Sequence, residues 1–157
     1  MTEVNGLRLA YRGFVSGIAG AYVWAAIAMA LSGWLHGDPV EPLRPLAMAI
    51  TPLAGTPELA FVLGLAAIQA GGAVVGMCFA YFFARFFTVR GTLALAGPIV
   101  AILAWALLTV LLDRGSGAMA ATDQAVAVLA TIGFGAVLGA NVPLRGEVTR
   151  SYGSPVT

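Results

Sequence analysis

Four long apolar runs dominate this chain, and polar residues gather between them. The runs cover about residues 13–35, 57–87, 92–112 and 122–142. No acidic, basic or histidine side chain lies in the middle of any run. A helix that crosses the hydrocarbon core of a bilayer needs about 20 predominantly apolar residues. The pattern therefore predicts an all-α integral membrane protein with four transmembrane helices.

The first run can be interpreted in two ways. Its Arg flank, its apolar core and Ala28-Met29-Ala30 near its end are the parts of a secretory signal peptide. The run is longer than the apolar region of such a peptide. We therefore interpret residues 13–35 as a retained transmembrane helix.

The segments between and after the runs are polar or rich in proline. Residues 36–57 contain five prolines, which prevent a continuous helix there and predict an outer loop, with a short turn at Leu46 to Ile50 on the membrane surface. The loop ends in Thr56-Pro57-Glu58, a helix start with Thr as its cap and Pro at its first position. Pro98 is expected to kink the third helix. Residues 144–157 form a polar tail.

The placement of arginine predicts the orientation of the helices. All the basic residues are Arg, and only Arg44 and Arg114 fall on one side of the predicted membrane. The other side holds the remaining six, which are Arg8, Arg12, Arg85, Arg90, Arg145 and Arg150. Because loops on the cytoplasmic side carry an excess of basic residues, we expect both termini and the tail in the cytoplasm.

Composition narrows the setting further. The chain is 60% hydrophobic and only 10% charged, and its net charge of +1 gives no basic surface for nucleic acid. It contains no Lys and abundant Ala, Gly and Val, a bias typical of GC-rich bacterial genomes. We therefore expect the bacterial cytoplasmic (inner) membrane.

Two landmarks recur and indicate a duplication. Arg12-Gly13 recurs as Arg90-Gly91, 78 positions later, and the GAVVG that begins at Gly72 recurs as GAVLG at Gly135, 63 positions later. The chain is thus predicted to consist of two repeated helical hairpins, related by a pseudo-twofold axis along the membrane normal.

Small residues at four-residue spacing predict where the helices pack. They form one stripe on each of three helices: Gly13, Gly17 and Ala21; Gly72 and Gly76; and Gly135 and Gly139. Small residues let helix backbones approach closely in lipid, where there is little hydrophobic drive for association. Packing within the bundle is the leading interpretation, and docking of a partner subunit is the alternative.

An aromatic and basic cluster lies near the end of the second run. Its members are candidates for contact with a partner or with lipid: Phe79, Phe82, Phe83, Arg85, Phe86 and Arg90. Aromatic and Arg side chains commonly anchor helices at the membrane interface. Anchoring and docking of a partner therefore both remain open.

Residues with catalytic chemistry are scarce. Gln69, in the middle of the second run, is expected to form an interhelical hydrogen bond. His36 at the outer edge is a lone histidine, and Cys78 is interpreted as a small buried side chain. No cluster of His, Cys or carboxylates can be assembled from the sequence, so no enzyme, cofactor or metal is expected.

The first helix is led by Arg-Gly, and the second has the form G-x(6)-G-G-x(3)-G and ends in aromatics and Arg. In these features the chain resembles small four-helix bacterial membrane proteins that accompany respiratory oxidase subunits. The resemblance implies an accessory subunit and carries over no functional residue. We therefore expect a non-catalytic subunit of a respiratory or otherwise energy-transducing complex, with other membrane subunits and lipids as partners. A small channel or facilitator for a neutral solute is the alternative.

Overall fold

The computed structural model of the chain describes residues 3–53, 56–83, 86–87, 89–116 and 123–142, and every element within them is helical. In chain order these elements are α1 (Glu3–His36), the 3₁₀ turn η1 (Glu41–Leu43), α2 (Arg44–Ile50), α3 (Pro57–Cys78), the π-helical turn η2 (Phe79–Phe83), α4 (Arg90–Ser116) and α5 (Gln124–Asn141). Four spans, namely α1, α3 with η2, α4 and α5, are long and apolar enough to cross a membrane. The prediction of an all-α chain with four such helices is confirmed.

The helix ends follow local sequence signals. The Oγ1 atom of Thr56 accepts a hydrogen bond from the backbone N–H of Leu59, so Thr56 caps α3 with Pro57 in its first turn, as predicted. At the start of α5, Asp123 Oδ1 accepts from the N–H groups of Ala125 and Val126. α1 starts before the expected Gly13, because it includes the polar residues from Glu3 onward. The second span changes to a π-helical turn after Cys78 rather than continuing as an α-helix to Phe87.

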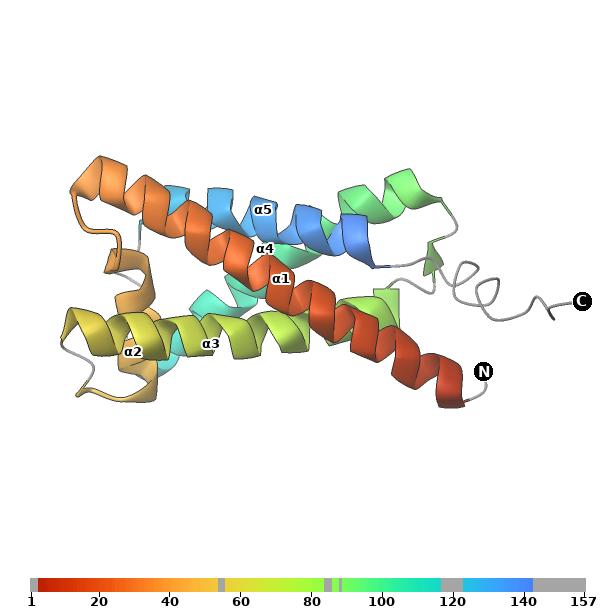
Figure 1. Cartoon of the computed structure of the whole chain (residues 1–157), viewed down its shortest axis with the longest axis horizontal. Helices are drawn as coiled ribbons and strands as arrows, with labels where there is room; N and C mark the ends of the chain where they lie inside the picture. Colours follow the sequence, from red (N-terminus) through yellow and green to blue (C-terminus); the bar gives the residue numbers. More distant parts are fainter. Residues whose placement is uncertain (1–2, 54–55, 84–85, 88, 117–122, 143–157) are drawn as a thin grey trace, which may run out of the picture.

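In Figure 1, α3 and α5 run roughly parallel on opposite sides of the bundle, and α1 and α4 run diagonally to them. α1 runs diagonally across α3 and α5 and packs against both, and α4 crosses behind them and packs against α5. The short helix α2 lies at the end of the bundle where α1 ends, and η2 lies near the opposite end. α3 and α4 are not packed against each other along their length.

Glycine contacts join α1 to α3 and to the η2 turn that follows it. A Cβ atom built on Gly13 would lie 2.6 Å from the Cβ of Ala80, and one built on Gly72 would lie 2.8 Å from the Cβ of Ala21. One built on Gly76 would lie 2.7 Å from the Cα of Gly17. Real Cβ atoms do not approach other heavy atoms this closely, so the two backbones meet only because these positions lack side chains.

A second set of glycines joins α4 to α5. A Cβ atom on Gly97 would lie 2.8 Å from the backbone nitrogen of Gly139, and one on Gly135 would lie 2.6 Å from the carbonyl oxygen of Gly97. An offset of 78 from Gly17 leads to Leu95, two positions before Gly97. Both hairpins thus close through glycines, but in different register.

The proline-rich segment packs more deeply than its composition predicts. Leu46 and Ala47 of α2 are buried, whereas Leu46 to Ile50 was predicted to form a turn on the membrane surface. The preceding turn presses on α3, where a Cβ atom on Gly64 would lie 2.6 Å from the carbonyl oxygen of Leu43. The proline-rich segment is therefore packed against α3 as part of the folded bundle.

Candidate functional site

A cavity of about 630 Å³, half open to the surroundings, lies between α3 and α4. α3 contributes Gly71 and Val75, and α4 contributes Ala104 and Trp105. Side chains of α1 and α5 also line it, and α2 lines it with Leu46, Ala49 and Ile50. Its walls are almost entirely apolar, which suits a ligand with little polar surface.

Two tryptophans and a threonine provide what polar groups the wall has. The rings of Trp24 and Trp105 lie 5.4 Å apart between centroids and are tilted by 38°. Trp24 Nε1 donates to Thr131 Oγ1 at 3.1 Å, and the Thr131 hydroxyl donates to the carbonyl oxygen of Ala127 at 2.7 Å. Trp105 is only 8% exposed, and its Nε1–H has no acceptor among the described residues. A buried indole N–H usually finds a partner, so leaving this donor unpaired is unfavourable for folding.

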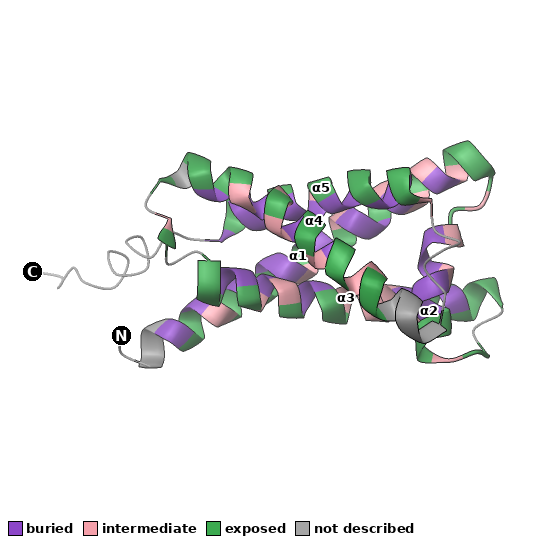
Figure 2. Cartoon of the chain, turned by 180° about the vertical axis from the view of Figure 1, so that it is seen from behind, coloured by how far each residue is buried: buried purple, intermediate pink, exposed green. Residues whose placement is uncertain are grey.

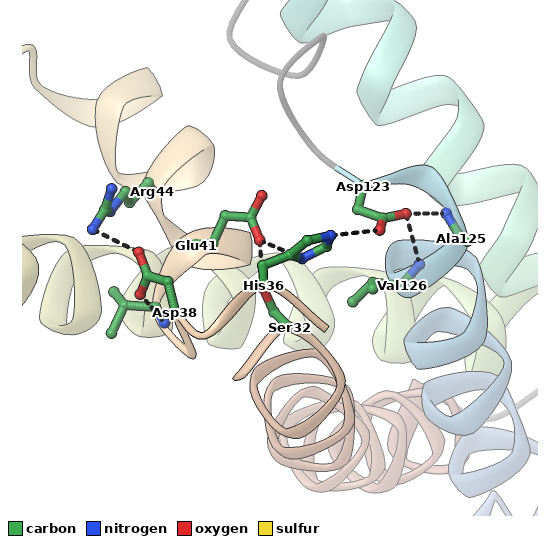
Figure 3. Close-up of polar contacts among 9 residues, drawn as sticks. Ser32, His36, Asp38, Glu41, Arg44, Asp123, Ala125 and Val126 are labelled. Carbon is green, nitrogen blue, oxygen red and sulfur yellow. Dashed lines mark hydrogen bonds and ion pairs between the residues drawn. The ribbon is translucent and has the colours of Figure 1, made fainter. Parts of the chain in front are cut away.

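A polar cluster ties three segments together at the α2 end of the bundle (Figure 3). His36 lies between two carboxylates, with Nδ1 3.0 Å from Glu41 Oε2 and Nε2 3.5 Å from Asp123 Oδ2. The Ser32 hydroxyl donates to the same Glu41 oxygen. Arg44 Nη2 pairs with Asp38 Oδ2 at 2.7 Å nearby. Because Asp123 also caps α5, this cluster fastens the end of α1 to η1 and to the start of α5.

The predicted aromatic cluster divides into a buried part and an exposed part. Phe79 is fully buried at 0% exposure and stacks with Phe83 at 6.1 Å, so its interpretation as an outward contact is wrong. It follows α3 directly, and the next residue, Ala80, meets Gly13 of α1. Phe82, Phe83 and Phe86 are exposed, and we call these three the aromatic ridge.

The two basic candidates beside the ridge cannot be placed in it. Arg85 lies outside the described residues. Arg90 begins α4, but its side chain is likewise outside them. Figure 2 shows how exposed positions lie over the outer faces of the helices while the buried ones line their contacts.

Two further predictions on α3 are wrong. Neither polar atom of the Gln69 amide has a hydrogen-bond partner among the described residues, so the expected interhelical bond is missing there. Gly72, one turn later, meets Ala21 of α1, which has no polar side chain to offer. Cys78 is exposed rather than buried, because it lies two positions beyond Gly76 and hence on the opposite side of the helix.

The predicted packing residues all lie where helices meet, but others with the same role escaped the sequence pattern. Gly20, Gly64 and Gly97 each sit where an added Cβ would collide with a neighbouring segment. Gly20 lies three positions after Gly17 and is therefore out of four-residue register, whereas Gly64 is in register with Gly72 but is separated from it by Ile68, which interrupts the run of small residues. In the described part of the chain, no three His, Cys, Asp or Glu side chains come together to hold a metal ion.

Comparison with known proteins gives no relative: no protein-family model, no curated protein and no solved structure matches this chain.

Proposed function

We propose that this protein is a non-catalytic subunit of a larger membrane complex, respiratory or otherwise energy-transducing. It lies at the periphery of the complex, in the bacterial cytoplasmic membrane, with both termini in the cytoplasm. Its partners are other membrane subunits and the surrounding lipids.

The observation that carries this proposal is the aromatic ridge. Phe82, Phe83 and Phe86 are exposed, whereas Phe79, only a few positions earlier in the chain, is fully buried. Aromatic side chains are enriched at protein interfaces, where they bury a large area at small entropic cost. The ridge also lies next to the start of α4, so a partner there would contact both hairpins.

The packing of side chains in the middle of the bundle favours a structural subunit over a facilitator for a solute. A solute path along an axis that relates the two hairpins would pass between α1 and α4. There the rings of Trp24 and Trp105 lie 5.4 Å apart, and their side chains are only 2% and 8% exposed. Close packing of large rings at this contact leaves little room for a polar path.

Purification from native membranes in a mild detergent tests the proposal. A tagged chain expressed at its natural level should elute with at least one other membrane subunit in a fixed molar ratio. Recovery of the chain alone, together with solute flux through it in liposomes, would favour the facilitator instead.

A further inference from the structure

His36 is the last residue of α1 and the only histidine in the chain. Its two ring nitrogens face carboxylates of two different segments, Glu41 of η1 and Asp123 at the start of α5 (Figure 3). Histidine is the side chain whose charge ordinarily changes between about pH 5 and 8. The link from α1 to α5 at this end of the bundle therefore passes through the one side chain of the protein that is best suited to sense pH.

The number of protons on the ring decides which of the two contacts can form. A neutral imidazole has a single N–H donor, so it donates to only one carboxylate. Nδ1 lies 3.0 Å from Glu41 Oε2, and without a proton it would bring its lone pair against those of the oxygen. The neutral ring therefore keeps its proton on Nδ1 and faces Asp123 Oδ2, 3.5 Å away, with a bare Nε2 that repels it. Only the imidazolium donates to both.

Two further hydrogen bonds make the two sides of this link unequal. The Ser32 hydroxyl donates to the same Glu41 oxygen that faces Nδ1, which holds η1 beside the end of α1 whatever the charge of the ring. On the other side, Asp123 Oδ1 accepts from two backbone N–H groups of α5, and Oδ2 remains for Nε2. The contact to η1 thus persists in both charge states, whereas the contact to α5 requires the second proton.

The other charged groups at this end do not replace the ring in this role. Asp38 pairs with Arg44 Nη2 of α2 at 2.7 Å, so its charge is compensated. Glu58, at the start of α3, is exposed and forms no ion pair with the ring in the described part of the chain. The side chains of Asp113 and Arg114 in α4 lie outside the described residues.

The exposure of the cluster determines how far the effect of the proton extends. The side chain of His36 is 40% exposed and that of Asp123 is 30% exposed, so the ring exchanges protons with the surrounding water. Ion pairs as exposed as this one contribute little to global stability. Helix ends, however, open locally without unfolding of the whole chain. The proton therefore acts on the first turn of α5.

We propose that His36 is a proton-operated latch between α1 and α5. At higher pH the neutral ring contacts η1 alone, and the start of α5 is released. When Nε2 gains a proton from water, the ring also donates to Asp123 and fastens α5 to the end of α1. The latch lies at the α2 end of the bundle, away from η2, and operates within the isolated chain, so it does not rest on the proposed function.

Nitrogen NMR of the ring tests the first step, because a single histidine gives a single pair of ring signals. The full-length chain is purified through a tag without histidine, labelled with nitrogen-15 in the histidine ring, and titrated in detergent micelles from about pH 8.5 to 5.5. We expect the neutral form to carry its proton on Nδ1, the less common tautomer in water. At the acidic end both nitrogens should be protonated.

Two substitutions of an acid by its amide form a matched pair. Asp123→Asn keeps a capping oxygen for α5 but removes the charge that faces Nε2, so the midpoint of the ring titration should fall by about half a pH unit. Glu58→Gln removes an equal charge from an exposed side chain that has no ion pair with the ring, and should leave the midpoint unchanged within about 0.1 unit.

Hydrogen exchange with water tests the second step. The backbone N–H groups of Ala125 and Val126 are held by the α5 cap and report opening of its first turn. After correction for the intrinsic pH dependence of exchange, their protection should rise about two- to fivefold as the ring gains its proton. In His36→Gln it should stay constant. The Leu59 N–H, held by the α3 cap, is the internal control and should not change in either protein.

Two results would overturn the proposal. A neutral ring with its proton on Nε2 would show that Glu41 is not the constant partner. Protection at Ala125 that is unchanged across the titration, or that changes equally at Leu59, would show that the proton does not control the start of α5. If circular dichroism shows that His36→Gln does not fold, Asp123→Asn takes its place, because it breaks the same contact and keeps the cap.

Discussion

Gly17 of α1 and Gly76 of α3 approach so closely that a Cβ atom on Gly76 would lie 2.7 Å from the Cα of Gly17. The contact between these two backbones has no side chain that could move aside. The crossing of α1 and α3 therefore depends on the absence of a methyl group at this point.

This contact predicts opposite effects for two nearby glycines. Gly76→Ala should lower the free energy of unfolding by about 1–3 kcal/mol, because the methyl group would force two backbones apart. Gly71→Ala should be neutral or stabilise by up to about 1 kcal/mol, since its methyl group enters open space and Ala favours the helix. Unfolding in mixed micelles, followed by circular dichroism, measures both. Equal effects at the two positions would contradict the packing described.

The second hairpin provides an independent version of the same test. Gly97→Ala should destabilise the chain, because its methyl group would collide with the backbone of α5. Gly91→Ala, on the same helix, should not, because no atom lies within 4 Å of a Cβ there. If Gly97→Ala unfolds at the same detergent ratio as the parent, α4 and α5 do not cross through these glycines.

The hydrogen bond between Trp24 and Thr131 should have a measurable effect on stability. Thr131→Val keeps the shape of the side chain but removes the acceptor of the Trp24 indole, so we expect a loss of about 1 kcal/mol. Thr109→Val is the control, because the Thr109 hydroxyl donates to the carbonyl of Ala106 in its own helix. If Thr109→Val loses a similar amount of stability, the effect comes from removing a threonine hydroxyl and not from the hydrogen bond with Trp24.

At the α2 end, Asp123 combines a helix cap with a charge next to His36. Asp123→Ala should reduce the free energy of unfolding by about 1 kcal/mol, because α5 loses its cap. Asp123→Asn retains a capping oxygen and removes only the charge, and the partly exposed pair with His36 contributes little. We therefore expect Asn to recover most of the loss. An Asn variant as unstable as the Ala variant would make the ion pair the dominant interaction.

The proposed orientation predicts which surface positions a membrane-impermeant maleimide reaches. In a Cys78→Ser background, Leu53→Cys should label on intact spheroplasts, because it lies in the exposed segment after α2. Val89→Cys, just before α4 and also exposed, should label only after the membrane is opened. The reverse pattern would place the termini outside the cell.

The sequence predicted the features that depend on neighbours along the chain. Uninterrupted apolar runs predict the four spans, and the local sequence Thr56-Pro57-Glu58 predicts the cap of α3. Gly13, Gly17, Gly72 and Gly76, which the four-residue spacing singles out, lie where α1 and α3 approach each other. The twofold relation of the hairpins remains a prediction, although the different register at Gly97 and the unequal helix contacts limit how closely they correspond.

The sequence could not predict the features that depend on which helices are neighbours in the fold. Phe79 and Phe82 are the same residue type in the same aromatic run, yet Phe79 is buried and Phe82 is exposed. The burial of Leu46 requires knowing that α2 folds back over α3. The cavity arises because α1 meets α5 while α3 and α4 remain apart. The sequence of any one helix does not determine which helices become its neighbours.

The most direct test of the account is whether the aromatic ridge holds the protein in a complex. A triple variant with Leu at Phe82, Phe83 and Phe86 should remain folded by circular dichroism, because these side chains are exposed, but lose most of its co-purifying partner. The matched control places Leu at three exposed aromatics elsewhere, Tyr22, Trp34 and Phe61, and should retain the partner. Full recovery of the partner by the ridge variant would contradict the proposed docking surface and reduce the ridge to a membrane anchor.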